Sequence, residues 1–343
     1  MTTKKRTEIS QLGEFGLIQH LTRDQKKTSD TLKSIGDDCA VIQNNGLKTL
    51  ITTDFLVEDI HFDMSYTPLK HLGYKAVVVN VSDIYAMNGK PKHITVSLAV
   101  SNRYSVEALE ELYAGIYLAC EHYGIDVIGG DTTSSLKGLV ISITAIGEAE
   151  ENKIVYRNGA KVGDFICVTG NLGAAYLGLQ ILIREKQVYL EDPNMKPEIN
   201  ESNTYLIQQI LKPEAKKNII EFLNAENILP HSMIDISDGL SSELMHICSQ
   251  SKVGCIIEEK SIPIDQMAYE QAMKFNLDPT VCAMSGGEDY ELLFTIDSKH
   301  RAAIEQNEGI SIIGEITEAS QGMKLQTRGG SLYDLKAQGW VSF

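Results

Sequence analysis

The sequence predicts an α/β (α+β) protein that is built from two domains. Its 343 residues exceed the roughly 150 that one domain usually contains. Segments with strand and helix patterns alternate along the chain, and the charged residues 148–153 separate two such series. We therefore expect an N-terminal domain over residues 1–150 and a C-terminal domain over residues 151–343.

The first domain combines apolar runs of strand type with two amphipathic helices. Apolar residues recur at helical spacing over residues 69–87. Ser105 precedes a second helical stretch, and the glutamates of its first turns favour a helix start there. The predicted strands occupy residues 49–55, 93–100, 125–128 and 139–147.

The second domain opens with a strand of buried type over residues 164–169 (DFICVT). A glycine-containing break follows, and a helix is expected to run to about residue 185. Residues 186–203 are polar and contain two prolines, so we expect a flexible surface loop there. Helices and further βα units are expected over residues 213–316.

The composition excludes several classes of protein. A net charge of -15 argues against a nucleic-acid binder, which needs a basic surface. No apolar run approaches the ~20 residues of a membrane helix. The polar, basic residues 1–8 have no apolar stretch behind them, unlike a signal peptide. Six cysteines without CxxC spacing indicate the reduced thiols of a cytoplasmic protein, with neither a disulfide framework nor a zinc site.

Aspartates in short turns flanked by glycine, serine or threonine are the strongest chemical signal. The chain has no GxxxxGK[ST] loop, no GxGxxG after a strand, no GxSxG elbow and no kinase HRD or DFG set. If the protein binds a nucleotide, it therefore uses a different kind of binding site. Six segments carry the aspartate pattern: GDD at 36–38, TTD at 52–54, SD at 82–83, GGD at 129–131, DISD at 235–238 and GGED at 286–289.

Carboxylates at the ends of strands should converge in a crevice, where they repel one another unless cations bind them. Mg²⁺ together with phosphate oxygens satisfies that requirement. One such segment alone would be explained as a helix cap or a turn, whereas six in one chain favour a magnesium and phosphate site. NVSDI at 80–84 and DISDG at 235–239 also echo each other, which indicates either two halves that serve one site or a chance likeness of two helix starts.

Three further residues each allow two interpretations. His61 follows Asp54 by seven residues, and it either folds back over the strand end or is structural. Arg157 either clamps a phosphate with two donors or pairs with a carboxylate. Trp340 is the only tryptophan, and it either docks the C-terminal tail or stacks on a ring-bearing ligand.

Taken in order, these segments resemble the bacterial thiamine-monophosphate kinases. The resemblance begins at residues 13–18 (GEFGLI) and covers nearly the whole chain. Its most specific motifs are IDISDGL at 234–240 and SGGEDYEL at 285–292. Other shared motifs are GDDCA at 36–40, YKA at 74–76, NVSDIYAMNG at 80–89, IGGDTT at 128–133 and RNGA at 157–160.

The resemblance implies the architecture of aminoimidazole-ribotide synthetase and selenophosphate synthetase, in which two N-terminal domains pair into a homodimeric β-barrel. It implies direct transfer of the γ-phosphoryl group of ATP to thiamine monophosphate with several Mg²⁺ ions. The product would be thiamine diphosphate, in the last step of its biosynthesis. Because the acceptor phosphate is already ionised, the burden on such a site is positioning and charge neutralisation.

Carried over residue by residue, the functional groups of the family fall into three sets. The expected magnesium ligands are Asp38, Thr52, Thr53, Asp54, Asp83, Asp131, Asp235 and Asp238, of which Asp54, Asp131, Asp235 and Asp238 are expected to be catalytic. The expected ATP contacts are Tyr113, Gly130, Asp131, Arg157 and Ser237. The expected thiamine-phosphate contacts are His61, Glu288 and Trp340.

Two other interpretations stay open. Another ATP-using enzyme of the same architecture is one, but selenophosphate synthetases use an N-terminal Cys or selenocysteine, and this chain has no cysteine before Cys39. The synthetases of purine synthesis lack the GGEDYEL pattern. The other is a non-catalytic module that binds divalent metal or nucleotide, in which His61, Arg157 and Glu288 would have no required role.

Overall fold

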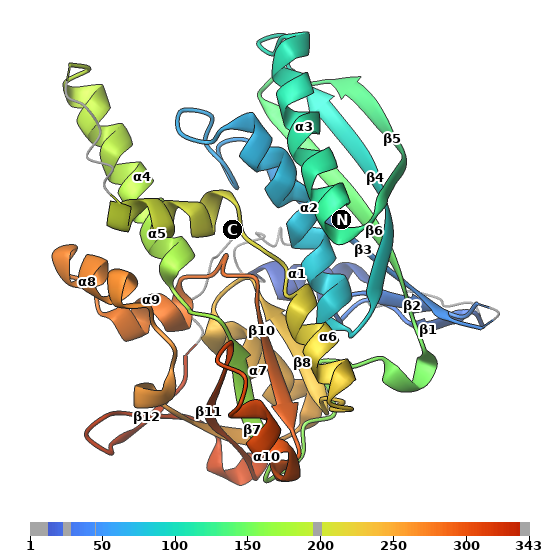
Figure 1. Ribbon diagram of the computed structural model, residues 1–343, viewed down its shortest axis with the longest axis vertical. Coiled ribbons are helices and arrows are strands. Elements are labelled where there is room, and N and C mark those ends of the chain that lie inside the picture. Colours follow the sequence, from blue (N-terminus) through green and yellow to red (C-terminus); the bar gives the residue numbers. More distant parts are fainter. Residues whose placement is uncertain (1–12, 23–28, 45, 195–200, 337–343) are drawn as a thin grey trace, which may run out of the picture.

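The computed structural model describes residues 13–22, 29–44, 46–194 and 201–336, which fold into two stacked α/β units (Figure 1). One six-stranded sheet belongs to the N-terminal half of the chain, and one seven-stranded sheet belongs to the C-terminal half. This arrangement confirms the predicted α/β (α+β) class. No helix of these described ranges is both long and apolar enough to cross a membrane.

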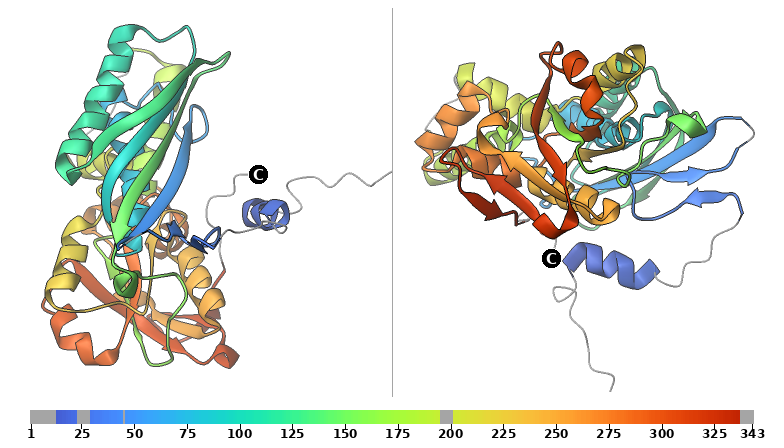
Figure 2. Two further views of the ribbon diagram at one scale, coloured as in Figure 1. Left: turned by 90° about the vertical axis from the view of Figure 1, so that its right-hand side faces the viewer. Right: turned by 90° about the horizontal axis from the view of Figure 1, so that it is seen from below.

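The N-terminal sheet has the strand order β1-β2-β3-β6-β4-β5, and only β4 and β5 pair in parallel. Alternate residues of β6 are buried, so one face of the sheet packs on helices while the other stays open. The elements are α1 (Gly13–Thr22), β1 (Thr31–Lys33), β2 (Ala40–Ile42), β3 (Lys48–Val57), α2 (Leu69–Ala86), β4 (Lys90–Val100), α3 (Val106–Tyr123), β5 (Asp126–Ser134), β6 (Leu139–Ala149) and the short η2 (Glu151–Lys153). Every strand and helix predicted for this half is present. Helix α1 lies apart from both sheets (Figure 2).

The C-terminal sheet has the strand order β13-β12-β9-β11-β7-β10-β8 and is antiparallel except between β12 and β9. Its strands are β7 (Phe165–Thr169), β8 (Ser232–Ile236), β9 (Gly254–Glu258), β10 (Glu291–Ile296), β11 (Ile310–Thr317), β12 (Met323–Gln326) and β13 (Leu332–Asp334). The helices of this half are α4 (Ala174–Glu191), α5 (Glu201–Leu211), α6 (Lys217–Ala225), α7 (Leu240–Ser251), η3 (Glu259–Ser261), α8 (Gln266–Lys274), α9 (Pro279–Ser285), η4 (Ser298–His300), α10 (Arg301–Ile304) and η5 (Ala319–Gln321).

The surface loop that composition predicts over residues 186–203 is wrong for residues 186–191 and 201–203, which are helical. Helix α4 continues to Glu191, and α5 begins at Glu201. Good helix formers fill the last turns of α4, and Lys186 forms an ion pair with Asp63 of the N-terminal half. The helix ends where the sequence requires it, because Asp192 precedes a proline and has extended backbone angles.

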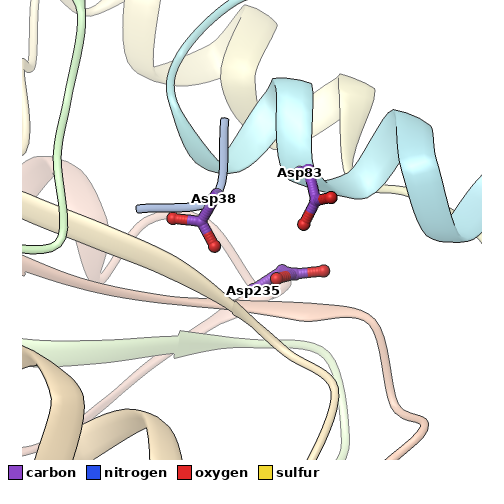
Figure 3. A group of neighbouring side chains, drawn as sticks. All are labelled: Asp38, Asp83 and Asp235. Carbon is purple, nitrogen blue, oxygen red and sulfur yellow. The ribbon is translucent and has the colours of Figure 1, made fainter. Parts of the chain in front are cut away.

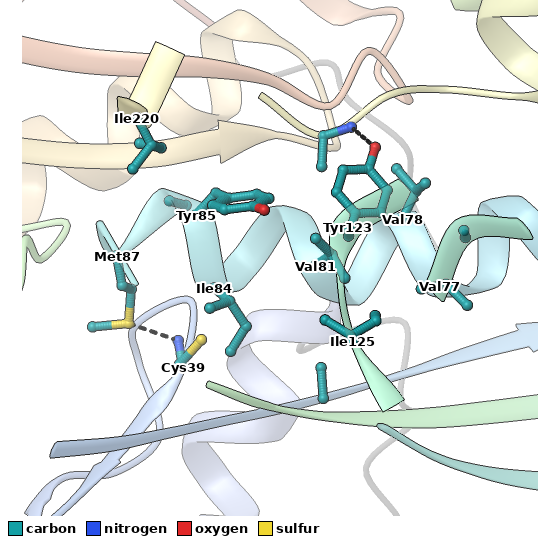
Figure 4. Packing of buried hydrophobic residues seen from close by; sticks show 14 of the residues in the cluster. Cys39, Val77, Val78, Val81, Ile84, Tyr85, Met87, Tyr123, Ile125 and Ile220 are labelled. Atoms are coloured by element: carbon teal, nitrogen blue, oxygen red, sulfur yellow. Dashed lines mark hydrogen bonds between the residues drawn. The ribbon is translucent and has the colours of Figure 1, made fainter. Parts of the chain in front are cut away.

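Helix α2 forms the centre of an apolar cluster that continues from the N-terminal half into the C-terminal half. Val77, Val81 and Ile84 of α2 are fully buried, and Ile220 of α6 belongs to the same cluster (Figure 4). Tyr123 of α3 also connects the two halves. Its hydroxyl accepts a hydrogen bond from the backbone N–H of Ala215, just before α6, at 2.9 Å. One apolar cluster therefore spans the two units, and two further clusters lie within the C-terminal half.

Helices α2 and α3 cross at two glycines. A Cβ atom at Gly115 would lie 1.9 Å from the carbonyl oxygen of Lys70, and one at Gly73 would lie 2.0 Å from that of Leu112. No side chain fits at either position. The close approach lets α2 and α3 cover the sheet as one layer.

We expect Gly115→Ala to lower the stability of the protein, although alanine favours a helix by about 1 kcal/mol. The added methyl group forces α2 and α3 apart, and such overpacking costs about 1–3 kcal/mol. Thermal denaturation followed by circular dichroism should show a Tm several degrees lower. The control Glu111→Ala, at an exposed position of the same helix, should leave Tm almost unchanged. A Tm of the Gly115 variant above that of the wild type would contradict this account of the crossing.

Candidate active site

A cavity of about 1230 Å³ is lined by residues of both halves of the chain. The N-terminal half contributes β3, the segment after it and one face of α2. The C-terminal half contributes α4, the end of β8 and the loops that follow β8 and α9. The predicted crevice of converging carboxylates therefore lies where the two units meet.

Three buried or half-buried carboxylates point toward one another in this cavity (Figure 3). Asp38 lies in the loop before β2, Asp83 in the last turns of α2 and Asp235 on β8. One oxygen of each lies within 4.8 Å of the others. Neither Asp83 nor Asp235 lies at the start of a helix, so the likeness of the two motifs is not that of two helix starts. The Ser82 hydroxyl of the first motif donates a hydrogen bond to Asp235 of the second at 2.6 Å. The two echoing motifs thus contact each other and serve one group.

Side chains of the described residues donate hydrogen bonds to each of these carboxylates. Arg157 donates two hydrogen bonds to Asp38, from Nη2 to Oδ1 at 2.9 Å and from Nε to Oδ2 at 3.2 Å. The Thr52 hydroxyl donates to Asp83 at 2.5 Å. Of the two interpretations of Arg157, the pairing with a carboxylate is what the structure contains, and that carboxylate is buried.

Burial and mutual repulsion raise the pKa values of this group. Burial raises the pKa of Asp38 to about 7, although Arg157 opposes the shift. Burial likewise raises the pKa of Asp235 to about 6, and it raises the pKa of Asp83 well above the usual range, with Asp54 adding repulsion. The pKa of Asp54 also rises to about 6, through burial and through the charge of Glu288.

This donor set fits Mg²⁺. The group offers carboxylate and hydroxyl oxygens, which hard divalent cations prefer, and it has more negative charge than Arg157 alone can neutralise. An ion bound to Asp38, Asp83 and Asp235 would remove the repulsion that raises their pKa values. When bound, it would supply positive charge beside phosphate oxygens.

Two loops of the C-terminal half pack backbone against backbone and form the opposite wall of the cavity. A Cβ atom at Gly287 would lie 2.6 Å from the Ser237 carbonyl, and one at Gly239 would lie 2.9 Å from the backbone of Ser285. Both glycines have positive φ angles, 69° and 120°. The glycines of the SGGEDY and DISDG motifs are thus required by the contact between the two loops, which brings Ser237, Asp238 and Glu288 to the cavity.

Glu288 is held in a conformation that few non-glycine residues adopt. Its φ is 62°, and that of Tyr290 is 49°. The Glu288 N–H donates to the Ser237 carbonyl at 2.7 Å, and the buried Asp289 carboxylate accepts the Gly173 N–H at 2.9 Å. These bonds offset the backbone strain and fix the direction of the Glu288 side chain.

Most of the predicted site residues line the same cavity. Thr52, Thr53 and Asp54 of β3 and His61 of the following segment belong to its wall. The Asp54 N–H donates to the Asn80 side chain at 3.1 Å, and the His61 Nδ1 accepts the Val57 N–H at 3.0 Å.

Three predicted residues do not line the cavity of a single chain. Gly130 and Asp131 lie on β5, at the edge of the N-terminal sheet, and Tyr113 lies on α3. Asp131 is exposed and pairs in register with Ser97 of β4, on the open face of the sheet. Trp340 lies outside the described residues.

The sequence-based assignment gives no role to Lys75 and Glu243, two charged residues of the cavity wall. Lys75 of α2 lines the cavity and pairs with Glu288. Glu243 of α7 accepts the backbone N–H of Asp238 at 2.9 Å and is buried. A signal for Lys75 existed, since it is the single charged side chain between Leu72 and Asn80, in an otherwise apolar stretch of helix.

We expect the metal-free protein to lose stability as the pH rises from about 4 to about 7. The folded-state pKa values of Asp38, Asp54, Asp83 and Asp235 lie above their ordinary values, so the folded state binds more protons than the unfolded state in this window. Mg²⁺ binds the ionised carboxylates, so it should raise Tm more at pH 8 than at pH 5.5. Asp83→Asn should reduce this pH-dependent response, and equal Mg²⁺ shifts of Tm at both pH values would argue against a metal site here.

Comparison with known proteins gives a consistent relationship over most of the chain. Two family models match: AIR synthase related protein, N-terminal domain, over residues 36–149, and AIR synthase related protein, C-terminal domain, over residues 161–325. The thiamine-monophosphate kinase of Aquifex aeolicus (strain VF5) is 36% identical over 323 residues, which cover 90% of this chain and 97% of that protein. The thiamine-monophosphate kinase of Bacillus subtilis (strain 168) is 33% identical over 296 residues, which cover 86% and 87% of the two chains.

A solved structure agrees with the sequence relationship. The structure described as AaThiL complexed with AMPPCP and TMP superposes with a TM-score of 0.85 and 32% identity, over 100% of both chains. The two chains therefore share their architecture. With its two AIR synthase related domains and these relatives, the chain belongs to the thiamine-monophosphate kinase family.

Proposed function

We propose that this chain is a thiamine-monophosphate kinase, which transfers the γ-phosphoryl group of ATP to the phosphate of thiamine monophosphate and releases ADP and thiamine diphosphate. The observation that carries the proposal is the convergence of Asp38, Asp83 and Asp235 from both halves into one cavity. Family membership, and a relative solved with AMPPCP and TMP, support the choice of substrates. We take residues 1–150 and 151–343 as the two domains that build the site.

The carboxylates would hold Mg²⁺, with Asp38, Thr52, Thr53, Asp54, Asp83, Asp131, Asp235 and Asp238 as the proposed ligands and Asp54, Asp131, Asp235 and Asp238 closest to the chemistry. Two anionic phosphates must approach each other for the reaction, so positive charge and positioning account for most of the catalysis. Arg157 adds a fixed cation beside this group, since its guanidinium pairs with Asp38. The ionised acceptor oxygen attacks in line and needs no general base.

The two substrates are assigned to different sets of residues. We assign Tyr113, Gly130, Asp131, Arg157 and Ser237 to ATP. We assign His61, Glu288 and Trp340 to thiamine monophosphate. A carboxylate such as Glu288 suits the cationic thiazolium ring or the amino group of the pyrimidine. Its direction is set by the loop contacts described above, which supports a role in orienting this substrate.

ADP release with and without thiamine monophosphate tests the proposal directly. We expect release only when thiamine monophosphate and Mg²⁺ are both present. ADP release without thiamine monophosphate would favour another enzyme of this architecture, and binding of ATP with no turnover of any kind would favour a non-catalytic module.

We expect Asp54→Asn to lower kcat by about 10²-fold or more, because the variant keeps the shape but loses one anionic ligand. The matched control is Asp192→Asn, the same chemical change at an exposed position after α4, and it should keep the activity of the wild type. Steady-state kinetics at limiting Mg²⁺ measures both variants. If Asp54→Asn turns over like the wild type, Asp54 is not a ligand of the metal.

We also propose that the chain forms a homodimer through its N-terminal domain. Strand β5 pairs with β4 alone among the described strands, so one edge of the sheet has free backbone groups. Ile128 on this strand is 55% exposed, and Phe55 on the open face of the sheet is 60% exposed. Pairing of two such sheets would cover both surfaces and close them into a barrel. It would also place a second chain over Asp131, which supports a role for Asp131 in a site completed by the partner.

The dimer predicts a particle of twice the 37.9 kDa of one chain in sedimentation at micromolar concentration. Ile128→Lys should shift the mass toward that of one chain, because it places a charge at the proposed interface. The control Val106→Lys changes another exposed apolar residue, at the start of α3, and should leave the mass unchanged. A wild-type particle of one chain at this concentration would rule the dimer out.

The other expectations are consistent with this function and stay proposals. The six cysteines are free and buried, as thiols of a cytoplasmic enzyme would be. The acidic surface does not suit nucleic acid. The proposed partners are therefore ATP, thiamine monophosphate, Mg²⁺ and a second copy of the chain.

A further inference from the structure

Lys75 is a buried cation in the wall of the cavity. The residue is 4% exposed, and its position on α2 lies between the apolar residues Leu72 and Val79, which also line the cavity. Its ammonium group forms an ion pair with the Glu288 carboxylate, with Nζ and Oε2 2.5 Å apart. Burial of an ammonium group is costly unless it is paired, and Glu288 provides that partner here.

The ion pair with Glu288 uses only part of the donor capacity of Lys75. An ammonium group has three N–H donors and no acceptor. Within the described ranges, the structure gives this group no partner besides Glu288. Because Lys75 lines the cavity, an anionic ligand that enters it can accept the remaining hydrogen bonds.

Lys75 lies on the same helix face as Asp83 of the carboxylate cluster, but at a different position along α2. Lys75, Val79 and Asp83 are spaced by four residues and all line the cavity, so they lie on one face of the helix. At about 1.5 Å per residue, the backbone positions of Lys75 and Asp83 are ~12 Å apart along the helix axis. The Lys75 ammonium group is paired with Glu288, a proposed contact of thiamine, and the charge of Glu288 also acts on Asp54 of the proposed metal site.

Charge complementarity identifies the chemical group that Lys75 suits. The vitamin part of thiamine monophosphate is cationic and would be repelled by an ammonium group, whereas its phosphate is anionic. Among the described residues that line the cavity, Lys75 is the lysine or arginine that the N-terminal half contributes, whereas Arg157 and Lys186 come from the C-terminal half and pair with Asp38 and Asp63. Of these three cations, Lys75 is the one that contacts Glu288, a proposed contact of thiamine monophosphate, so it is placed to meet the phosphate of that substrate.

We propose that Lys75 donates hydrogen bonds to the phosphate of thiamine monophosphate and thereby makes the site select the phosphorylated vitamin over free thiamine. Glu288 has two functions in this arrangement, because it recognises the cationic end of the substrate and holds the Lys75 side chain in place. The inference rests on the proposed function, and it assigns the specificity for the acceptor to a residue on α2.

Binding of two ligands that differ only in the phosphate tests this role. Isothermal titration calorimetry measures the affinity of wild type, Lys75→Met and Glu288→Gln for thiamine monophosphate and for thiamine. Lys75→Met should weaken thiamine monophosphate by roughly 10- to 100-fold, as expected for the loss of a charge-assisted hydrogen bond, and should weaken thiamine less than about twofold. Glu288→Gln should weaken both ligands. The control Lys70→Met, at an exposed position of the same helix, should change neither affinity.

The possible outcomes separate the alternatives. If Lys75→Met weakens both ligands equally, Lys75 only positions Glu288, and if it weakens neither, Lys75 has no contact with the substrate; both results overturn the proposal. If the wild type binds thiamine monophosphate no better than an unrelated phosphate monoester, the proposed function fails, not the role of Lys75 within it. Lys75→Gln is a second variant in case Lys75→Met does not fold, because glutamine keeps a donor for Glu288 but removes the charge. The ratio of its affinities for thiamine monophosphate and thiamine then tests the proposal in the same way.

Discussion

Electrostatic repulsion among Asp38, Asp83 and Asp235 is the constraint on which the rest of the structure depends. Buried carboxylates this close together disfavour the folded state when they are ionised. The protein offsets this cost with Arg157, with hydroxyl donors and with an apolar cluster that continues from one half to the other. Binding of a divalent cation then becomes favourable because it relieves this excess of negative charge, and a bound cation would in turn attract the anionic phosphates of the substrates.

Helix α2 connects this constraint to the core. One of its faces packs into the apolar cluster, with Val77 and Ile84 fully buried, and another carries Lys75 and Asp83 into the cavity. The crossing with α3 at Gly115 holds the helix against the sheet. A shift of α2 would therefore move a cation and a carboxylate of the site together, and it would disturb the core at the same time.

The sequence predicts the local features of this molecule well and the contacts between distant segments less well. Strand and helix patterns identify β3, α2, β4 and α3, because apolar periodicity is a local property. The aspartate segments identify Asp38, Asp83 and Asp235, but only the fold brings residues 38 and 235 together. Composition is misleading for residues 186–191, because polar helix formers and polar loops look alike until a partner such as Asp63 is known. The pairing of Lys75 with Glu288 likewise has no sequence signal, since it joins two elements more than 200 residues apart.

The shared apolar cluster has a consequence for how the protein folds. Residues of α2, α6, β8 and β10 pack in one cluster, so loss of the N-terminal half would remove part of the core that supports the C-terminal half, whose own clusters lie around β7 and α4. A fragment that ends there would expose the face of α2 that packs against α6. Hydrogen exchange of α2 amides should therefore follow global unfolding, and neither half should persist as a stable fragment after proteolysis of the linker.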